Sequence, residues 1–199
     1  YKRQVRGDMS LRELLGSLCS NPLPEDVPFT VVEGWRIREI DAALAAKGWI
    51  VAGVYADLAT RKAVDAPFEI TSPTLEGYLF PETYKFVPSR FTAEELIERQ
   101  LATFSDRFLS RHPDGFGKRT LHDIVVVASM LEREEPKPSN RPLVSGVIWK
   151  RLDTGWELGI DATSRYTLAD WNDRDAFLKL LKDPADPYGT RVRKGLPPT

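Results

Sequence analysis

A helix that is bounded at both ends and carries a carboxylate after an apolar run is the feature that most constrains this chain. Thr120 and Asp123 have the spacing of a capping box, and Pro136 prevents the helix from continuing. Residues 126–131 are apolar or small, and Glu132 follows them directly. Burying a carboxylate costs several kcal/mol unless the protein neutralises it or gives it partners. We therefore expect a helix of about fifteen residues that carries an acid with a functional reason to be there.

Helical spacing suggests which acid is buried. Glu132 falls on the face of Leu121, Val125, Ala128 and Ser129, whereas Glu134 falls on the face of Asp123, Val127 and Met130. A carboxyl on an apolar face has its charged form disfavoured, so we expect Glu132 to be a proton donor, with Glu134 as the second candidate. The alternative is a structural ion pair, for which Arg133, Arg141 and Arg151 are the available partners.

A ring-rich loop precedes this helix. It carries Glu76, Tyr78 and Tyr84, and prolines at positions 67, 73, 81 and 88 limit its freedom. The rings could line a groove and stack on sugars, or they could anchor the loop to the core. Glu76 could likewise face a groove or support the helix of Glu132. Among the scattered tryptophans, Trp156 is the candidate for a subsite.

The remaining pattern predicts an α+β protein in two parts. Residues 1–66 alternate short strand-like and helix-like pieces, and residues 67–199 are mainly helical with a short β element. The predicted helices start at Ser10, Arg36, Thr92, Thr120 and Asn140, a strand covers 29–32, an extended stretch covers 156–160, and a further helical turn or two covers 163–168. Tyr1 to Val5 resembles the interior of a strand, so we expect a piece of a longer protein.

Composition excludes several classes of function. The formal net charge is -1 and basic residues form no stripe, so nucleic acid is not an expected partner. Cys19 is the only cysteine, and His112 and His122 lack ligands at helical spacing, so we expect no disulfide, no metal and no cofactor. No apolar run in the sequence approaches the roughly 18 to 20 residues that cross a bilayer.

Four motifs resemble one family in the same order. These are the strings Leu-Glu-Gly-Tyr-Leu-Phe-Pro-Glu-Thr-Tyr (75–84), Ala-Ser-Met-Leu-Glu-Arg-Glu (128–134), Lys-Arg-Leu-Asp-Thr-Gly (150–155) and Gly-Leu-Pro-Pro (195–198). Together they resemble the endolytic murein transglycosylases of the MltG (YceG-like) family. The resemblance implies a LysM-like module over 1–66, incomplete at its N-terminus, and a lysozyme-like catalytic domain over 67–199, incomplete at its C-terminus.

The resemblance also implies a reaction and a place for it. Such enzymes are lytic transglycosylases that cleave the β-1,4 bond between N-acetylmuramic acid and N-acetylglucosamine in peptidoglycan glycan strands and leave a 1,6-anhydro end. They are thought to end growing strands beside peptidoglycan synthases. A single N-terminal helix, absent from this chain, would anchor the enzyme in the cytoplasmic (inner) membrane with this region on the periplasmic, extracytoplasmic side.

The resemblance assigns site residues by motif. Glu132 falls at the position of the family's catalytic glutamate, and the resemblance implies a reaction that uses no metal and no cofactor. The substrate-binding candidates are Glu76, Tyr78, Tyr84, Asp161, Thr163, Tyr166 and Tyr188.

Some positions depart from the family pattern. This chain has Gly159 where the family commonly has Gln, Ala162 where it has Pro, and Gly189 where it has Asn. Gly159, Gly189 and the end of the chain before the family's C-terminal portion favour an alternative function, a cell-wall glycan-binding module with impaired catalysis. A hydrolytic muramidase would instead need a second carboxylate, such as Asp161 or Glu134, facing Glu132.

Overall fold

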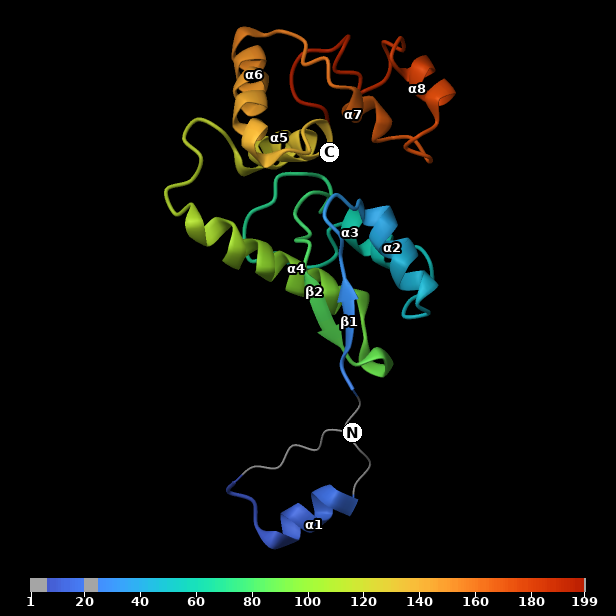
Figure 1. Ribbon diagram of the computed structural model, residues 1–199, viewed down its shortest axis with the longest axis vertical. Helices are drawn as coiled ribbons and strands as arrows, with labels where there is room; N and C mark the ends of the chain where they lie inside the picture. The colour runs from blue at the N-terminus through green and yellow to red at the C-terminus, as the bar shows by residue number, and fades with distance from the viewer. Residues whose placement is uncertain (1–6, 20–24, 199) are drawn as a thin grey trace.

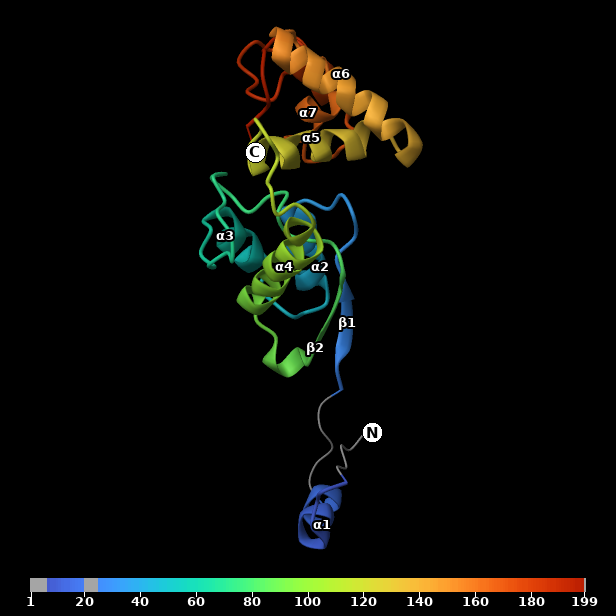
Figure 2. The ribbon, with the colours of Figure 1, turned by 90° about the vertical axis from the view of Figure 1, so that its left-hand side faces the viewer.

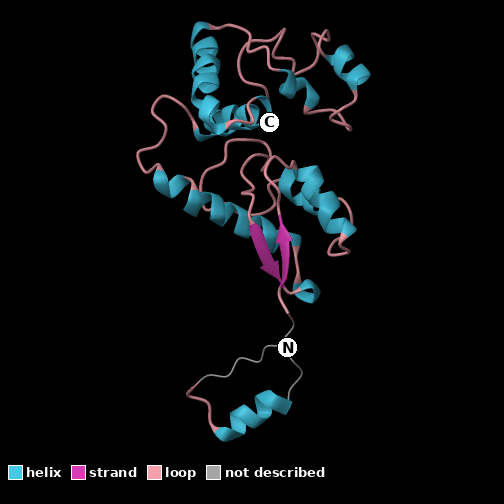
Figure 3. Cartoon of the chain, viewed as in Figure 1, coloured by secondary structure: helices cyan, strands magenta, loops and turns pink. Residues whose placement is uncertain are grey.

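The computed structural model describes residues 7–19 and 25–198, and this part is mainly helical with one two-stranded antiparallel sheet (Figures 1 and 3). The structure agrees with the predicted α+β class at that level. The strand expected at Tyr1 to Val5 lies outside the described residues. None of the helices in the described ranges combines the length and the apolar character needed to cross a membrane.

The elements follow the local signals in the sequence. The helices are α1 Leu11–Cys19, α2 Ile37–Ala46, α3 Val54–Thr60, α4 Ala93–Arg107, α5 Leu121–Glu134, α6 Arg141–Thr154, α7 Asp161–Arg165 and α8 Arg174–Leu180; the strands are β1 Val27–Thr30 and β2 Thr83–Phe86; the 3-10 turns are η1 Pro88–Arg90, η2 Leu109–Arg111 and η3 Pro138–Asn140. The capping box at α5 is formed in both directions, since the Asp123 N–H donates to Thr120 Oγ1 and the Thr120 N–H donates to Asp123 Oδ2. All five predicted helix starts are confirmed to within one residue.

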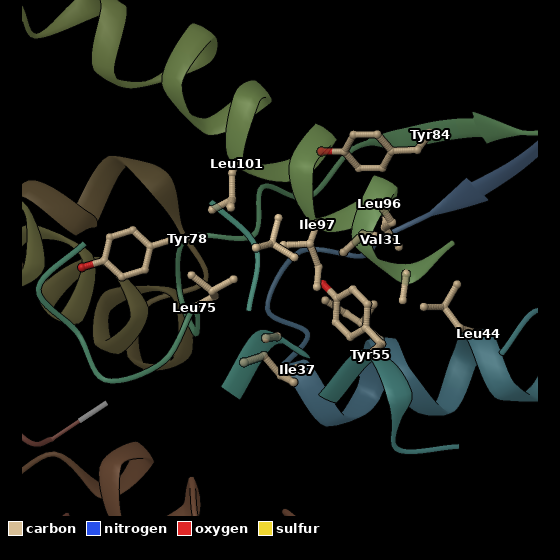
Figure 4. Packing of buried hydrophobic residues seen from close by; sticks show 14 of the residues in the cluster. Val31, Ile37, Leu44, Tyr55, Leu75, Tyr78, Tyr84, Leu96, Ile97 and Leu101 are labelled. Carbon is tan, nitrogen blue, oxygen red and sulfur yellow. The ribbon is translucent and has the colours of Figure 1, made fainter. Parts of the chain in front are cut away.

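The small sheet joins the two predicted parts of the chain. β1 pairs with β2 in a register that sets Val27 opposite Phe86 and Thr30 opposite Thr83. The first core extends from Phe29 to Val125 and so takes residues from both sides of position 66 (Figure 4). The expected boundary after residue 66 therefore does not separate two hydrophobic cores. The strand predicted at 29–32 is also displaced, because pairing ends at Thr30.

A second, smaller core forms between α5, α6 and the following segment. It contains Val126, Val127, Met130, Ile148, Leu158 and Ile160. Figure 2 shows α5 at the junction, with α2, α3 and α4 on one side of it and α6 and α7 on the other. Val125 belongs to the first core and its neighbour Val126 to the second, so α5 buries different faces against different cores.

Candidate active site

A cavity of about 200 Å³ lies between the two cores. Its walls come from the segment before α2, the loop before β2, α5, α7 and the end of the described chain. Five residues predicted from the sequence line it: Glu76, Glu132, Thr163, Tyr166 and Tyr188. The fold thus brings together segments that lie more than 100 positions apart in the sequence.

Glu132 lines the cavity but is exposed, so the prediction that it is buried is wrong. Its supposed face is also exposed at Ala128 and Ser129. The helix buries Val126, Val127 and Met130 instead, because the second core packs there. Glu132 lies in the last turn, beyond Val125, where α5 passes the end of the first core and meets the cavity.

The Glu132 carboxylate forms no hydrogen bond or ion pair within residues 7–19 and 25–198. The three arginines that could have paired with it each donate to a backbone carbonyl: Arg133 to Gly34 at 2.6 Å, Arg141 to Glu135 at 3.0 Å and Arg151 to Leu158 at 2.5 Å. A structural ion pair therefore does not explain this acid. Its Oε1 atom lies 3.7 Å from the position that a Cβ would take at Gly34, so the carboxylate faces that turn.

The other two candidate carboxylates have structural partners. Glu134 Oε1 accepts a hydrogen bond of 3.3 Å from the Ala162 N–H in the first turn of α7. Asp161 Oδ1 accepts from Arg191 Nε at 2.7 Å in a partly exposed ion pair. Neither Glu134 nor Asp161 lines the cavity.

The second acid of the cavity is Glu76, which is half-buried. Its Oε2 atom accepts hydrogen bonds from the Ile37 N–H at 3.1 Å and from the Tyr166 hydroxyl at 3.3 Å. Burial raises the pKa of the Glu76 carboxyl, and these two hydrogen bonds oppose that effect. Burial also raises the pKa of Tyr166 and of Tyr188, whose rings lie 5.1 Å apart. Glu76 thus links the first core to α7 through one carboxylate.

Glu76 should make the stability of the protein depend on pH. Because the folded protein holds this proton more tightly than the unfolded chain does, the free energy of unfolding should fall as pH rises from about 4.5 through the raised pKa. Glu76→Gln should remove this fall, since the amide keeps the volume and does not titrate. Glu98→Gln, at an exposed position on α4, is the control and should keep the wild-type slope. Urea unfolding across this pH range measures the free energy of unfolding. The same dependence of this free energy on pH in wild type and in Glu76→Gln would contradict the prediction.

Thr163, Gly159 and Gly189 make structural contacts around α7. Thr163 Oγ1 donates to Ile160 O at 2.7 Å and lies 3.0 Å from Thr190 Oγ1. Gly159 has a φ of +66° and its N–H donates to Thr190 O at 2.9 Å. A Cβ at Gly189 would lie 3.3 Å from Asp186 O. The two glycines among the three departures from the family pattern, Gly159 and Gly189, therefore fall where the local backbone is left-handed or tightly packed.

Tyr78 and Tyr84 lie in the first core and do not line the cavity. The Tyr78 ring packs against Phe104, with ring centroids 5.7 Å apart, and its hydroxyl lies 3.1 Å from His122 Nδ1. The Tyr84 hydroxyl donates to Phe80 O at 2.9 Å. These contacts correspond to the anchoring role, one of the two roles that the sequence left open for these rings. Neither ring lines the cavity.

Two tryptophans in the cavity wall, Trp35 and Trp171, were not selected from the sequence. Trp156, the tryptophan that was predicted to form a subsite, is 66% exposed and lies outside the cavity. Trp171 has no periodic or motif signal that could have found it. The Arg165 side chain places it by donating to its backbone oxygen at 2.8 Å.

No group of three or more His, Cys, Asp or Glu side chains in the described part of the chain is placed to hold a metal ion. The polar side chains of the cavity are carboxylates, phenols, aliphatic hydroxyls, indoles and guanidinium groups. That set can donate and accept protons and can hydrogen-bond a hydroxyl-rich ligand.

Known proteins are similar to this chain in sequence. A Bacillus subtilis (strain 168) protein named endolytic murein transglycosylase is 26% identical, over 96% of this chain and 56% of that protein. A Streptococcus pneumoniae protein of the same name is 38% identical over 40% of this chain and 14% of its own length. The chain thus spans little more than half the length of the first of these relatives.

A solved structure and a family model agree with these matches. The crystal structure of a YceG-like protein from Listeria monocytogenes superimposes with a TM-score of 0.71 at 23% identity, covering 96% of this chain and 67% of that one, which shows a common fold. The model of the YceG-like family matches residues 3–199. This chain belongs to the YceG-like family.

Proposed function

We propose that this chain carries an endolytic lytic transglycosylase site that cleaves peptidoglycan glycan strands, with Glu132 as the catalytic acid and base. The observation that supports it most directly is a cavity-lining carboxylate that no described residue neutralises. Relatives named endolytic murein transglycosylases support the same substrate class.

The proposed reaction needs one carboxyl group and no water. Glu132 donates its proton to the glycosidic oxygen as the bond from that oxygen to C1 of N-acetylmuramic acid breaks. The C6 hydroxyl of the same sugar then attacks C1, and the Glu132 carboxylate takes the hydroxyl proton. The products are a new 4-hydroxyl end on N-acetylglucosamine and a 1,6-anhydro end, and Glu132 returns to its protonated form.

The facing wall would position the sugar and support positive charge at C1. Glu76 accepts a hydrogen bond from Tyr166, whose ring packs on Tyr188, so the three form one connected unit in the cavity wall. We propose these three as substrate-binding residues, with Thr163 fixing the backbone of α7 beneath them. Asp161 keeps α7 in place through Arg191, and Tyr78 and Tyr84 act by anchoring the loop that carries Glu76.

Mass analysis of digestion products tests this proposal. Purified glycan strands should yield 1,6-anhydromuramic ends, with no oxygen incorporated from labelled water. Reducing ends that carry the label would instead require a hydrolase with a second carboxylate, and Glu76 is then the first to replace, since Asp161 and Glu134 lie outside the cavity. Binding of strands without any cleavage would favour the glycan-binding module.

The setting of the enzyme is part of the same proposal. Murein lies outside the cytoplasmic membrane, so we propose action there, with the enzyme anchored in that membrane and with peptidoglycan synthases as partners. The LysM-like character of the N-terminal part and the lysozyme-like character of the helical part belong to this proposal too.

A further inference from the structure

A stacked cation lies at the edge of the cavity, next to Glu132. The guanidinium carbon of Arg133 lies 4.5 Å from the ring centroid of Trp171, and both residues line the cavity. Arg133 Nη2 also donates to Gly34 O at 2.6 Å. A cation held over an aromatic face and tied at one nitrogen keeps a fixed orientation, with most of its N–H donors still available.

Arg133 forms no ion pair with a carboxylate among the described residues. The second arginine near the same ring differs in this respect. Arg36, 5.8 Å from the centroid of Trp171, is paired with Glu39 and donates to Tyr166 O at 2.9 Å. Its charge and its donors are therefore already used, and Arg133 is the cation at this wall that can bind an anion.

Arg133 and the proposed acid reach the same point of the cavity. A Cβ at Gly34 would lie 3.6 Å from Arg133 Nη2 and 3.7 Å from Glu132 Oε1. A ligand group that contacts Arg133 therefore belongs to a sugar close to the one on which Glu132 acts. Guanidinium groups bind carboxylates through paired, charge-assisted hydrogen bonds.

We infer that Arg133, stacked on Trp171, binds a carboxylate carried by the O3 substituent of the muramic sugar in the cavity. This inference rests on the proposed function. The carboxylate has two possible sources: the lactyl group itself on strands without stem peptides, or the stem peptide where the lactyl group is already an amide. In both cases Arg133 sets which strands are cleaved, and Glu132 carries out the cleavage.

Matched substrates test this inference. Strands stripped of stem peptides by an amidase keep free lactyl carboxylates, and coupling them to methylamine gives neutral strands of the same length. We expect wild type to prefer the charged strands in kcat/KM by about tenfold or more, the effect of a charge-assisted hydrogen-bond pair. Arg133→Gln should bring that ratio close to one. Because the ratio compares two substrates of one enzyme, a partial loss of folded protein cancels.

The control variant is Arg119→Gln. Arg119 stacks on Trp149 at 4.4 Å and pairs with Asp153, so it is an arginine on a tryptophan that does not line the cavity. It should keep the wild-type ratio. If Arg133→Gln yields no folded protein, Arg133→Lys replaces it, and loss of the planar guanidinium should lower the ratio while the charge keeps part of it.

Strands that retain their stem peptides separate the two sources. A loss of turnover with Arg133→Gln on these strands places the carboxylate on the peptide, whereas a loss confined to stripped strands places it on the lactyl group. A ratio that stays at the wild-type value in Arg133→Gln, with peptide-bearing strands also unaffected, overturns the inference while leaving the proposed function in place. Failure of wild type to cleave any of the three strands overturns both.

Discussion

Glu132→Gln should lower the turnover of glycan strands by about 100- to 10,000-fold, the contribution of a positioned general acid, and leave the melting temperature close to that of wild type. The amide keeps the volume of the side chain but cannot donate the proton. Stability should change little because Glu132 is exposed and makes no hydrogen bond or ion pair in the described ranges. Thermal melts by circular dichroism and product release from purified strands measure the two quantities.

Glu134→Gln is the matched control, two residues further along the same helix. Glu134 holds the first turn of α7 and lies outside the cavity, so turnover should persist. Near-normal turnover in Glu132→Gln together with loss in Glu134→Gln would reverse the assignment. Loss of helical signal in Glu132→Gln would mean that the residue supports the fold.

Helix ends were predictable because their causes are local. At α5, Thr120 and Asp123 form the capping box at the N-terminus. Pro136, two residues after the last helical residue, prevents the helix from continuing. At α4, Thr92 Oγ1 accepts from the Glu95 N–H at 3.1 Å in the same way. Of the missed elements, α8 has a local cap that was overlooked in the sequence, since Asp173 Oδ1 accepts from the Ala176 N–H at 2.9 Å, whereas α3 and β2 depend on distant partners. Asp41 caps α3 by accepting from the Gly53 N–H at 2.7 Å, and β2 needs β1.

The burial of Glu132 was mispredicted because one stripe was assumed for a helix that has two. Val125 packs into the first core and Val126, Val127 and Met130 into the second. A single hydrophobic face cannot describe a helix that lies between two cores. The position of Glu132 in its motif identified the candidate acid, whereas its environment had to come from the packing.

The rest of the candidate site could not be predicted because tertiary contacts create it. Glu76 meets Tyr166 across 90 positions, and Arg36 and Arg38 both donate to backbone carbonyls around α7, at Tyr166 and Leu168. These contacts hold the second core against α2 and enclose the cavity. Trp171 enters the wall only because this turn of chain is held there.

Gly77→Ala should destabilise the protein by about 2–5 kcal/mol and displace the loop that carries Glu76. The φ of Gly77 is +87°, which is unfavourable by about 1–2 kcal/mol for a residue with a side chain. A Cβ there would also lie 2.5 Å from Val125 Cγ1, and overpacking of this kind costs about 1–3 kcal/mol. Val125 is β-branched and buried on α5, so it has little freedom to move away. Urea unfolding measures the loss.

Gly48→Ala separates the two causes. Gly48 has a φ of +70° but nothing within 4 Å of a Cβ, so this variant should show the backbone cost alone. Val125→Ala removes the methyl group that the new Cβ meets, so Gly77→Ala and Val125→Ala should be less destabilising together than the sum of their separate effects. Equal losses in Gly77→Ala and Gly48→Ala, or strict additivity in the double variant, would show that the approach of the loop to α5 is not what requires glycine at this position.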